Sequence, residues 1–360
     1  MATDPRQSAH PDERAADRSV AVVRRPRATV YTVARTAGVS ISTVSLAINQ
    51  PHRVADATRK RIVAAARALG YRPDGAWRAR TGGRPVGIAV AAPFTSYSSY
   101  SRRMSGVLDR LRDSGIDVMI YDLEAATAAG TPLLDALPVR AGVDGILVMG
   151  VSLSTDGGSR LAEWGPPVVL LDAQEDRTPS VLMDDEQGGL LVGRHLAELG
   201  HRRVAFLRDE PRSPDTASAS ALRRKGLAEG LGAPERAEVV ALDASAATDG
   251  GTALLAAVRD GVTAIFATHD ELAALVSSGL RAAGIRVPGD VSLVGFDDGP
   301  LAAALDLTTV RQPFEESGRT AADLLLRLMA DGTSVMRTTL AVKLMVRTST
   351  ARAVDLAATR

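Results

Sequence analysis

The sequence predicts an α/β protein in which a small all-α helix-turn-helix unit precedes a two-lobed domain with two parallel sheets. Residues 30–71 show short helical patterns separated by tight breaks. From Val86 onward, short apolar runs alternate with amphipathic helical segments, which is typical of βαβ units and parallel sheets. At least eight such runs occur over about 260 residues, which favours two sheets over one.

The helix-turn-helix pattern lies within residues 30–49. Val33, Ala34 and Ala37 give a first helix its apolar face, and Gly38 allows the positive φ that ends a helix. Ser40 is placed to cap a second helix, whose inward residues would be Val44, Ala47 and Ile48. A third helix is predicted over 56–69, with a core face formed by Ile62, Ala65, Ala66 and Leu69.

The larger domain begins near residue 85, and its strands and helices can be placed by their apolar patterns. The predicted strands are 86–92, 116–122, 145–150, 168–172, 203–208, 237–242, 264–268 and 291–298. The helical candidates between them are 186–199, 217–231, 252–259 and 271–283.

Other parts of the chain carry no regular pattern. Residues 1–28 are rich in charged residues, proline and alanine, so we expect a disordered extension. The helix-turn-helix domain is then 29–72, the segment 73–84 is a hinge rich in glycine and arginine, and 355–360 form a tail.

Charge is distributed unevenly, although the formal net charge is only +1. Residues 1–83 contain 15 Lys and Arg against 6 Asp and Glu, and the rest of the chain contains 28 against 36. A small basic module joined to an acidic body points to a polyanion such as DNA as partner, with a solvated basic tail as the alternative.

Several classes of function are disfavoured by the composition. The chain has no cysteine, which excludes disulfide and thiolate chemistry and suits a reducing cytoplasm. No apolar run is long enough for a membrane span, and the N-terminus does not resemble a secretory signal. Catalytic motifs for nucleophilic, dinucleotide or phosphate chemistry are missing, and the five histidines are scattered. We therefore expect no enzyme, no metal, no cofactor and no membrane partner.

The residues also resemble a known family. The run VARTAGVSISTVSLAINQ and the later TRKRIVAAARALGYRPD are similar to the DNA-binding headpiece of the LacI/GalR (lactose-repressor) family. DDEQGG, LAELGHRRVAFL, RRKGL, GIRVPGDVSLVGFDD and TTVRQPFEESGRTAADLLL are similar to its periplasmic-binding-protein-like ligand domain. The resemblance extends from about Thr29 to Thr350. It implies an effector-binding and dimerisation domain over 85–350, with lobe 1 at about 85–184 and 312–340 and lobe 2 at about 185–311 and 341–354.

The second helix is therefore expected to enter the major groove of an operator. Hydroxyls and backbone N–H groups at its start would bind phosphates, and its outward side chains would face bases. The residues expected to contact DNA here are Ser40, Ile41, Ser42, Thr43, Ser45, Leu46 and Asn49.

Three positions depart from the family pattern. Leu46 stands where an arginine is common, so apolar contact replaces bidentate binding of guanine. Arg80 stands where the family inserts a hinge leucine into the minor groove, and Trp77 could act as the wedge or pack between two hinge segments. Ala55 replaces the usual serine before the third helix, so its cap shifts to Asp56 or is lost.

Ligands of two-lobed parallel α/β proteins bind where the strands end at their carboxyl side. The resemblance implies effector contacts for residues at or near such ends, namely Asp172, Arg223, His269, Asp297 and Gln312. Carboxylates with an arginine and an amide suit vicinal hydroxyls, which favours a sugar. Phe94, Tyr97 and Tyr100 follow the first strand and could stack on a sugar ring, with a plain surface loop as the alternative. Asp270 is expected to cap the helix that begins near Glu271.

Together these features predict a cytoplasmic, homodimeric repressor that binds an operator through two headpieces and is controlled by a small polar molecule, with a sugar favoured. The alternatives are an exported solute-binding protein, which would need a signal and no headpiece, and a sugar-modifying enzyme, which would need a catalytic constellation.

Overall fold

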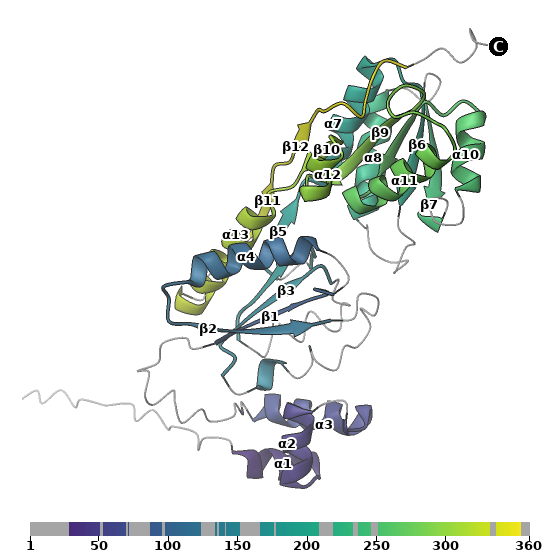
Figure 1. The fold of residues 1–360 in the computed structure, drawn as a ribbon. Coiled ribbons are helices and arrows are strands. Elements are labelled where there is room, and N and C mark those ends of the chain that lie inside the picture. Colours follow the sequence, from purple (N-terminus) through teal and green to yellow (C-terminus); the bar gives the residue numbers. More distant parts are fainter. Residues whose placement is uncertain are drawn as a thin grey trace, which may run out of the picture.

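The computed structural model shows a three-helix unit and two α/β lobes (Figure 1). It describes residues 29–50, 53–69, 71, 87–95, 98–123, 134, 137–140, 142–151, 166–175, 178–208, 219–232, 237–245, 251–331 and 336–353. Trp77, Arg80 and Tyr97, and the side chains of Ile48 and Asn49, lie outside the described residues, so the expectations placed on them stay predictions.

The three-helix unit consists of α1 (Val30–Ala37), α2 (Ile41–Asn49) and α3 (Asp56–Ala68). Gly38 ends α1 with a φ of 64°, in the left-handed region where glycine has no steric penalty. A small shared core forms from aliphatic side chains of all three helices: Val33, Ala34, Ala37, Val44, Ala47, Ile62, Ala65 and Ala66. The predicted helix-turn-helix is confirmed.

Two details of this unit differ from the prediction. Leu69 is 37% exposed rather than buried, because α3 ends at Ala68 and the following turn carries Leu69 off the core face. Val63 is buried in α3 instead. At the start of α3, the Arg59 N–H donates to the carbonyl of Ala55, whose side chain offers no capping acceptor.

Lobe 1 contains a six-stranded sheet in the order β11-β5-β4-β3-β1-β2. All of its pairings are parallel. Its strands are β1 (Gly87–Ala92), β2 (Asp117–Asp122), β3 (Gly145–Met149), β4 (Val168–Leu171), β5 (Ser180–Met183) and β11 (Arg337–Leu340). Helices α4 (Ser99–Leu111) and α13 (Phe314–Asp331) pack together over one face of this sheet. The short η2 (Leu137–Val139) contributes to the core on the other face.

Lobe 2 repeats this plan, with a sheet in the order β12-β10-β9-β8-β6-β7. Its strands are β6 (Arg203–Arg208), β7 (Glu238–Asp243), β8 (Ala264–Ala267), β9 (Ser292–Asp297), β10 (Thr308–Arg311) and the antiparallel β12 (Lys343–Met345). Helices α7 (Asp185–Glu198) and α8 (Ala219–Leu231) contribute to the core on one face. Helices α10 (Thr252–Arg259), α11 (Asp270–Ala282) and α12 (Pro300–Ala304) cover the other face.

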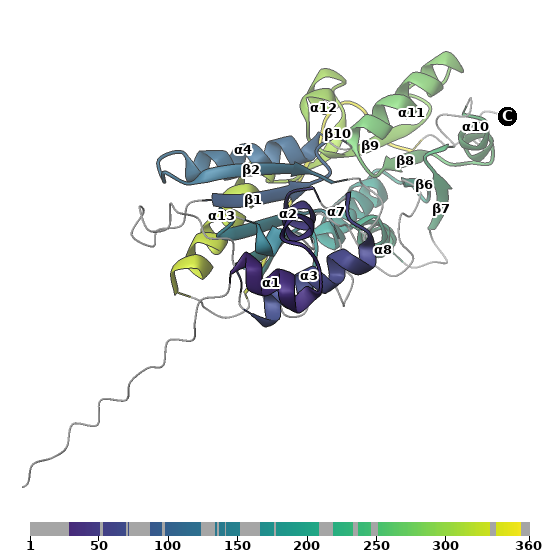
Figure 2. The same ribbon diagram turned by 90° about the horizontal axis from the view of Figure 1, so that it is seen from below.

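The chain passes between the two lobes three times. The crossings follow β5, β10 and β11, each with only one or two residues before the next element of the other lobe. Figure 2 shows α4 and β2 on the same side of the molecule as α11 and α12. The predicted fold class, a helix-turn-helix with two parallel-sheet lobes, is confirmed.

Candidate functional site

Helix α2 presents a polar, exposed N-terminus, as a DNA-recognition helix requires. The Ser40 hydroxyl accepts a hydrogen bond from the Thr43 N–H (3.1 Å) and lies 2.7 Å from the hydroxyls of Ser42 and Thr43. Ile41, Ser42 and Ser45 are exposed, whereas Thr43 and Leu46 are half-buried. Because the cap fixes the first turn, the exposed side chains and free N–H groups are held ready for phosphates and base edges.

A second polar site forms where the carboxyl ends of both sheets meet, and Arg223 is its centre in lobe 2. Its Nε donates to Asp185 Oδ1 (2.8 Å), and its Nη1 donates to the carbonyl of Thr268 (2.5 Å). The guanidinium lies 3.8 Å from the centre of the Phe296 ring. These contacts fix the plane of the guanidinium at the end of the lobe-2 strands.

Close packing of α7 on α8 determines where Arg223 lies. A Cβ atom added to Gly226 would lie 1.9 Å from the Glu186 carbonyl oxygen, and one added to Gly189 would lie 2.0 Å from that of Arg223. Only glycine permits this separation, so the RRKG and EQGG segments set the position of the guanidinium.

Asp297 and Asp172 provide carboxylates from the two lobes: Asp297 is the last residue of β9, and Asp172 directly follows β4. Both have a positive φ, 110° for Asp297 and 54° for Asp172. Gln312 donates through Nε2 to Asp297 Oδ1 (2.6 Å). Burial raises the pKa of Asp297 to about 6 against the opposing effect of Arg223. Burial also raises the pKa of Asp172, whose carboxylate pairs with Arg103. Both carboxyl groups therefore lie in surroundings that disfavour an extra negative charge.

Electrostatic interactions place most of the predicted effector residues within reach of one another. Asp297 interacts with Arg223, Arg103 and His269, and Asp172 interacts with Arg103, Asp185 and Arg223. We call Arg103, Asp172, Arg223, Asp297 and Gln312 the inter-lobe cluster. It combines hydrogen-bond donors and acceptors from both lobes in one place.

Residues next to this cluster, His269 and Asp270, form hydrogen bonds that fix the backbone around it. The expectation for Asp270 is wrong, because His269 is the residue that caps α11, accepting from the Leu272 N–H (3.2 Å). Asp270 is instead buried and accepts from Thr309 Oγ1 (2.7 Å) and the Gly299 N–H (2.8 Å). It thereby ties the loop after β9 to β10.

Asp298 also has a structural role, because it accepts hydrogen bonds from Arg311 and Arg347 (both 2.5 Å). Although burial opposes ionisation, these two partners bring its pKa below the ordinary value. The adjacent Asp297 is consequently held toward the inter-lobe cluster.

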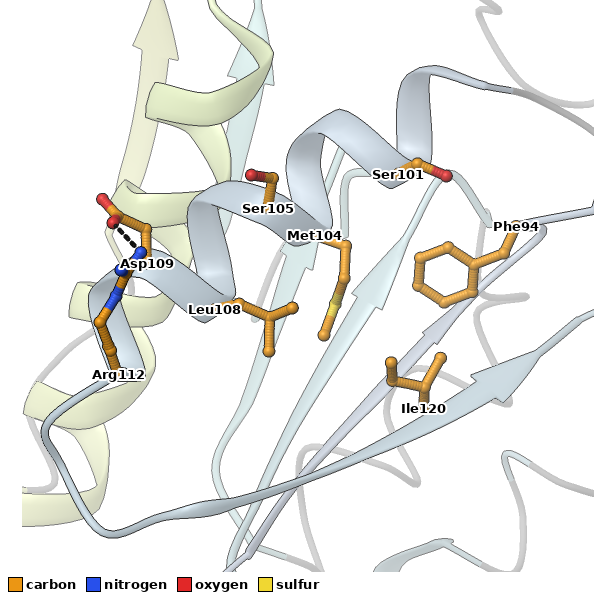
Figure 3. A pocket seen from close by; sticks show the side chains of 8 residues that line it. All are labelled: Phe94, Ser101, Met104, Ser105, Leu108, Asp109, Arg112 and Ile120. Carbon is orange, nitrogen blue, oxygen red and sulfur yellow. Dashed lines mark hydrogen bonds and ion pairs between the residues drawn. The ribbon is translucent and has the colours of Figure 1, made fainter.

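The aromatic residues after β1 separate in the structure. Tyr100 lies against Gly150 at the end of β3, and its ring centre is 5.2 Å from the Arg103 guanidinium. Phe94 does not join the inter-lobe cluster: it points into a groove between α4 and β2, beside Met104 and Ile120 (Figure 3). The Phe94 N–H bonds back to the Ala92 carbonyl (2.9 Å), and this tight turn leaves the ring against the lobe-1 core.

Arg103 is the member of the inter-lobe cluster that the sequence patterns missed. It lies on α4, is 4% exposed, and stacks 4.1 Å from the centre of the Phe314 ring. Its neighbour Arg102 donates to Glu315 (2.9 Å) and to the Asp297 and Asp298 carbonyls (3.5 and 3.4 Å), and so joins the lobes. An arginine three residues before a glycine (RMSG) matches RRKG of lobe 2, and this was the signal available in the sequence.

The chemistry available here is binding. Guanidinium and amide donors beside carboxylate acceptors suit a ligand with several hydroxyl groups. Among the described residues, no group of three His, Asp or Glu side chains is arranged to hold a metal ion. Within the same residues, no helix is both long and apolar enough to cross a bilayer.

A capped recognition helix joined to two lobes with a charged ligand site defines a ligand-controlled DNA-binding protein. Family comparisons agree: residues 29–74 match the model of bacterial regulatory proteins of the lacI family, and 194–350 match a periplasmic binding protein-like domain. The transcriptional regulator DegA of Bacillus subtilis is 31% identical, over 81% of this chain and 88% of its own length. The chain belongs to the LacI family of transcriptional regulators.

Solved structures show the same architecture. A complex of the transcriptional regulator CelR with cellobiose matches with a TM-score of 0.63 and 29% identity, covering 90% of this chain and all of that one. A lac repressor dimer bound to its operator and an anti-inducer matches with a TM-score of 0.64 and 27% identity, covering 91% of this chain and all of that one. The resemblance found in the sequence is confirmed.

Proposed function

We propose that this protein is a homodimeric repressor that binds an operator through α2. A sugar bound to the inter-lobe cluster would either weaken or strengthen that binding. One observation carries the proposal: donors and acceptors from both lobes converge at the sheet ends, in a chain that also contains a helix-turn-helix. The CelR structure, which contains cellobiose, supports a sugar as effector. A ligand that contacts both lobes would change their relative position and hence the spacing of two headpieces.

The first prediction concerns DNA. We expect the wild-type protein to retard the DNA upstream of its own gene in a mobility-shift assay at low salt. Ser42→Asp should weaken this binding at least tenfold, because a carboxylate would face phosphates while remaining acceptable in the first turn of a helix. Thr252→Asp adds the same charge to the exposed first turn of α10 and should bind as the wild type does.

The same assay tests the ligand control. Adding cellobiose and other sugars should change the affinity for DNA in one direction or the other. The proposal would be contradicted if Ser42→Asp retarded the DNA as well as Thr252→Asp does, or if no sugar changed the affinity for DNA.

The second prediction concerns the dimer. Leu108 and Ile120, beside the groove of about 730 Å³ in Figure 3, are 46% and 55% exposed, and Leu275 of α11 is 51% exposed. These apolar side chains belong to elements on one side of the molecule, which is the arrangement expected where a second copy packs. The lac repressor structure, which is a dimer, supports the same partner.

We expect Ile120→Glu to shift sedimentation from dimer toward monomer, because the carboxylate would lose its water in the interface. Met336→Glu is the matched control, since Met336 is 45% exposed beside β11, at the opposite edge of the same sheet. A dimer that survives Ile120→Glu and dissociates with Met336→Glu would place the interface elsewhere.

A further inference from the structure

The two lobes are built around equivalent arginines. Their sheets have the same strand order, so α4 after β1 corresponds to α8 after β6. Arg103 precedes Gly106 by three residues in α4, and Arg223 precedes Gly226 by three residues in α8. A Cβ on either glycine would lie 1.9 Å from the carbonyl of a glutamate on the partner helix.

The partner helices show the same correspondence. A Cβ added to Gly318 of α13 would lie 1.9 Å from the Arg103 carbonyl, as one on Gly189 of α7 would lie 2.0 Å from that of Arg223. The segment FEESG of α13 therefore matches DEQGG of α7 residue by residue. Arg103 is the lobe-1 counterpart of Arg223.

One pair of corresponding positions differs between the lobes in a way that changes the hydrogen bonds available to the arginine. Asp185, which accepts from Arg223 Nε, corresponds to Phe314 in lobe 1, which offers Arg103 only the face of its ring. Arg103 pairs with Asp172 through Nη2, while its Nε and Nη1 have no hydrogen-bond partner among the described residues. The side chain is only 5% exposed, so these donors are largely withdrawn from water.

Buried charged donors without acceptors are costly, and a ligand that supplies the acceptors regains that free energy. The orphaned donors belong to the inter-lobe cluster, beside the carboxylates of Asp172 and Asp297. A ligand there must accept hydrogen bonds from Arg103 and donate them to the carboxylates. Hydroxyl groups do both, whereas a carboxylate or phosphate only accepts and would add charge near Asp172, Asp185 and Asp297.

We propose that Arg103 is a second specificity-determining guanidinium, which binds hydroxyl oxygens of a neutral polyhydroxylated effector through its Nε and Nη1. This inference rests on the proposed function and adds to it a named contact and the charge of the ligand. Arg223, already held by Asp185 and Thr268, would bind the lobe-2 side of the same ligand.

The test uses the full-length protein and a panel of neutral pentoses, hexoses and disaccharides, including ribose and cellobiose, with the corresponding sugar phosphates and uronic acids. Binding is measured by thermal shift and then by calorimetry. Arg103→Lys keeps the positive charge beside Asp172 and removes both orphaned N–H groups. Arg103→Gln, which can still donate to Asp172, serves if the lysine variant does not fold.

We expect a neutral sugar to bind the wild type and to bind Arg103→Lys at least tenfold more weakly. Arg110→Lys, on the exposed part of the same helix, should stay within twofold of the wild type. Three results would each overturn the inference. The Arg103 variants could bind the sugar as tightly as the wild type, the wild type could bind only charged compounds, or it could bind no neutral member of the panel. Retardation of DNA by the unliganded variants should stay normal, so a wild type that fails to bind DNA would count against the proposed function and not against Arg103.

Discussion

Replacing Gly226 by alanine should lower the free energy of unfolding of lobe 2 by about 3 kcal/mol, a cost typical of overpacking. The added Cβ would lie 1.9 Å from the Glu186 carbonyl oxygen and 2.6 Å from the Leu190 nitrogen. Both atoms belong to the backbone of α7, so neither can rotate away and the helices must separate. Because Arg223 lies three residues earlier, sugar binding should weaken as well.

Gly279→Ala provides the matched control. Gly279 lies in α11 with open space around its Cα. Removing a glycine from a helix interior there should raise stability by about 0.5–1 kcal/mol. Urea unfolding followed by circular dichroism measures both variants. A Gly226→Ala protein as stable as the wild type would mean that glycine does not set the separation of α7 and α8.

The sequence predicted the elements whose patterns are local and strong. Buried strands such as β1, β3 and β6 are continuous apolar runs, and α10 was predicted with its observed bounds. The strands β5, β10, β11 and β12 were missed, because they have only three or four residues and carry polar side chains. Their conformation depends on pairing with distant strands, which no local pattern records.

The residues of the candidate site were likewise predictable only where a local sequence pattern marks them. Asp172 and Asp297 were found because each lies at the carboxyl end of an apolar run, Asp172 just after β4 and Asp297 as the last residue of β9. Arg103 was missed because its burial depends on α13, more than 200 residues later, which packs on α4 through Gly106 and Gly318. Phe94 was misplaced since strand position alone does not decide which way a turn directs a ring. The clustering of aromatic residues was therefore a weaker guide than strand ends.

The stability of the wild-type protein should decrease as the pH rises from about 4 to 7, and Asp270→Asn should remove much of this decrease. Burial raises the pKa of Asp270 to about 7, against the hydrogen bond from Thr309, while the nearby Asp297 raises it further. The folded protein thus keeps a proton on Asp270 at a pH where the unfolded chain has released it. Since the folded state binds more protons in this window, its stability falls as the pH increases.

The variant should gain about 4 kcal/mol over the wild type between pH 4 and pH 8, because the pKa of Asp270 rises from 3.8 to about 7 on folding and one unit of pKa corresponds to about 1.4 kcal/mol. Asparagine can keep both contacts: its oxygen accepts from the Gly299 N–H, and its amide donates to the Thr309 hydroxyl. Urea unfolding at each pH measures the difference, with Asp113→Asn on the exposed turn after α4 as the control. Parallel pH profiles for wild type and Asp270→Asn would show that this carboxyl group is ionised in the folded protein throughout the window. The tie between β10 and the loop after β9 would then rest on a buried charge, and removing that charge would be expected to loosen the loop that follows Asp297.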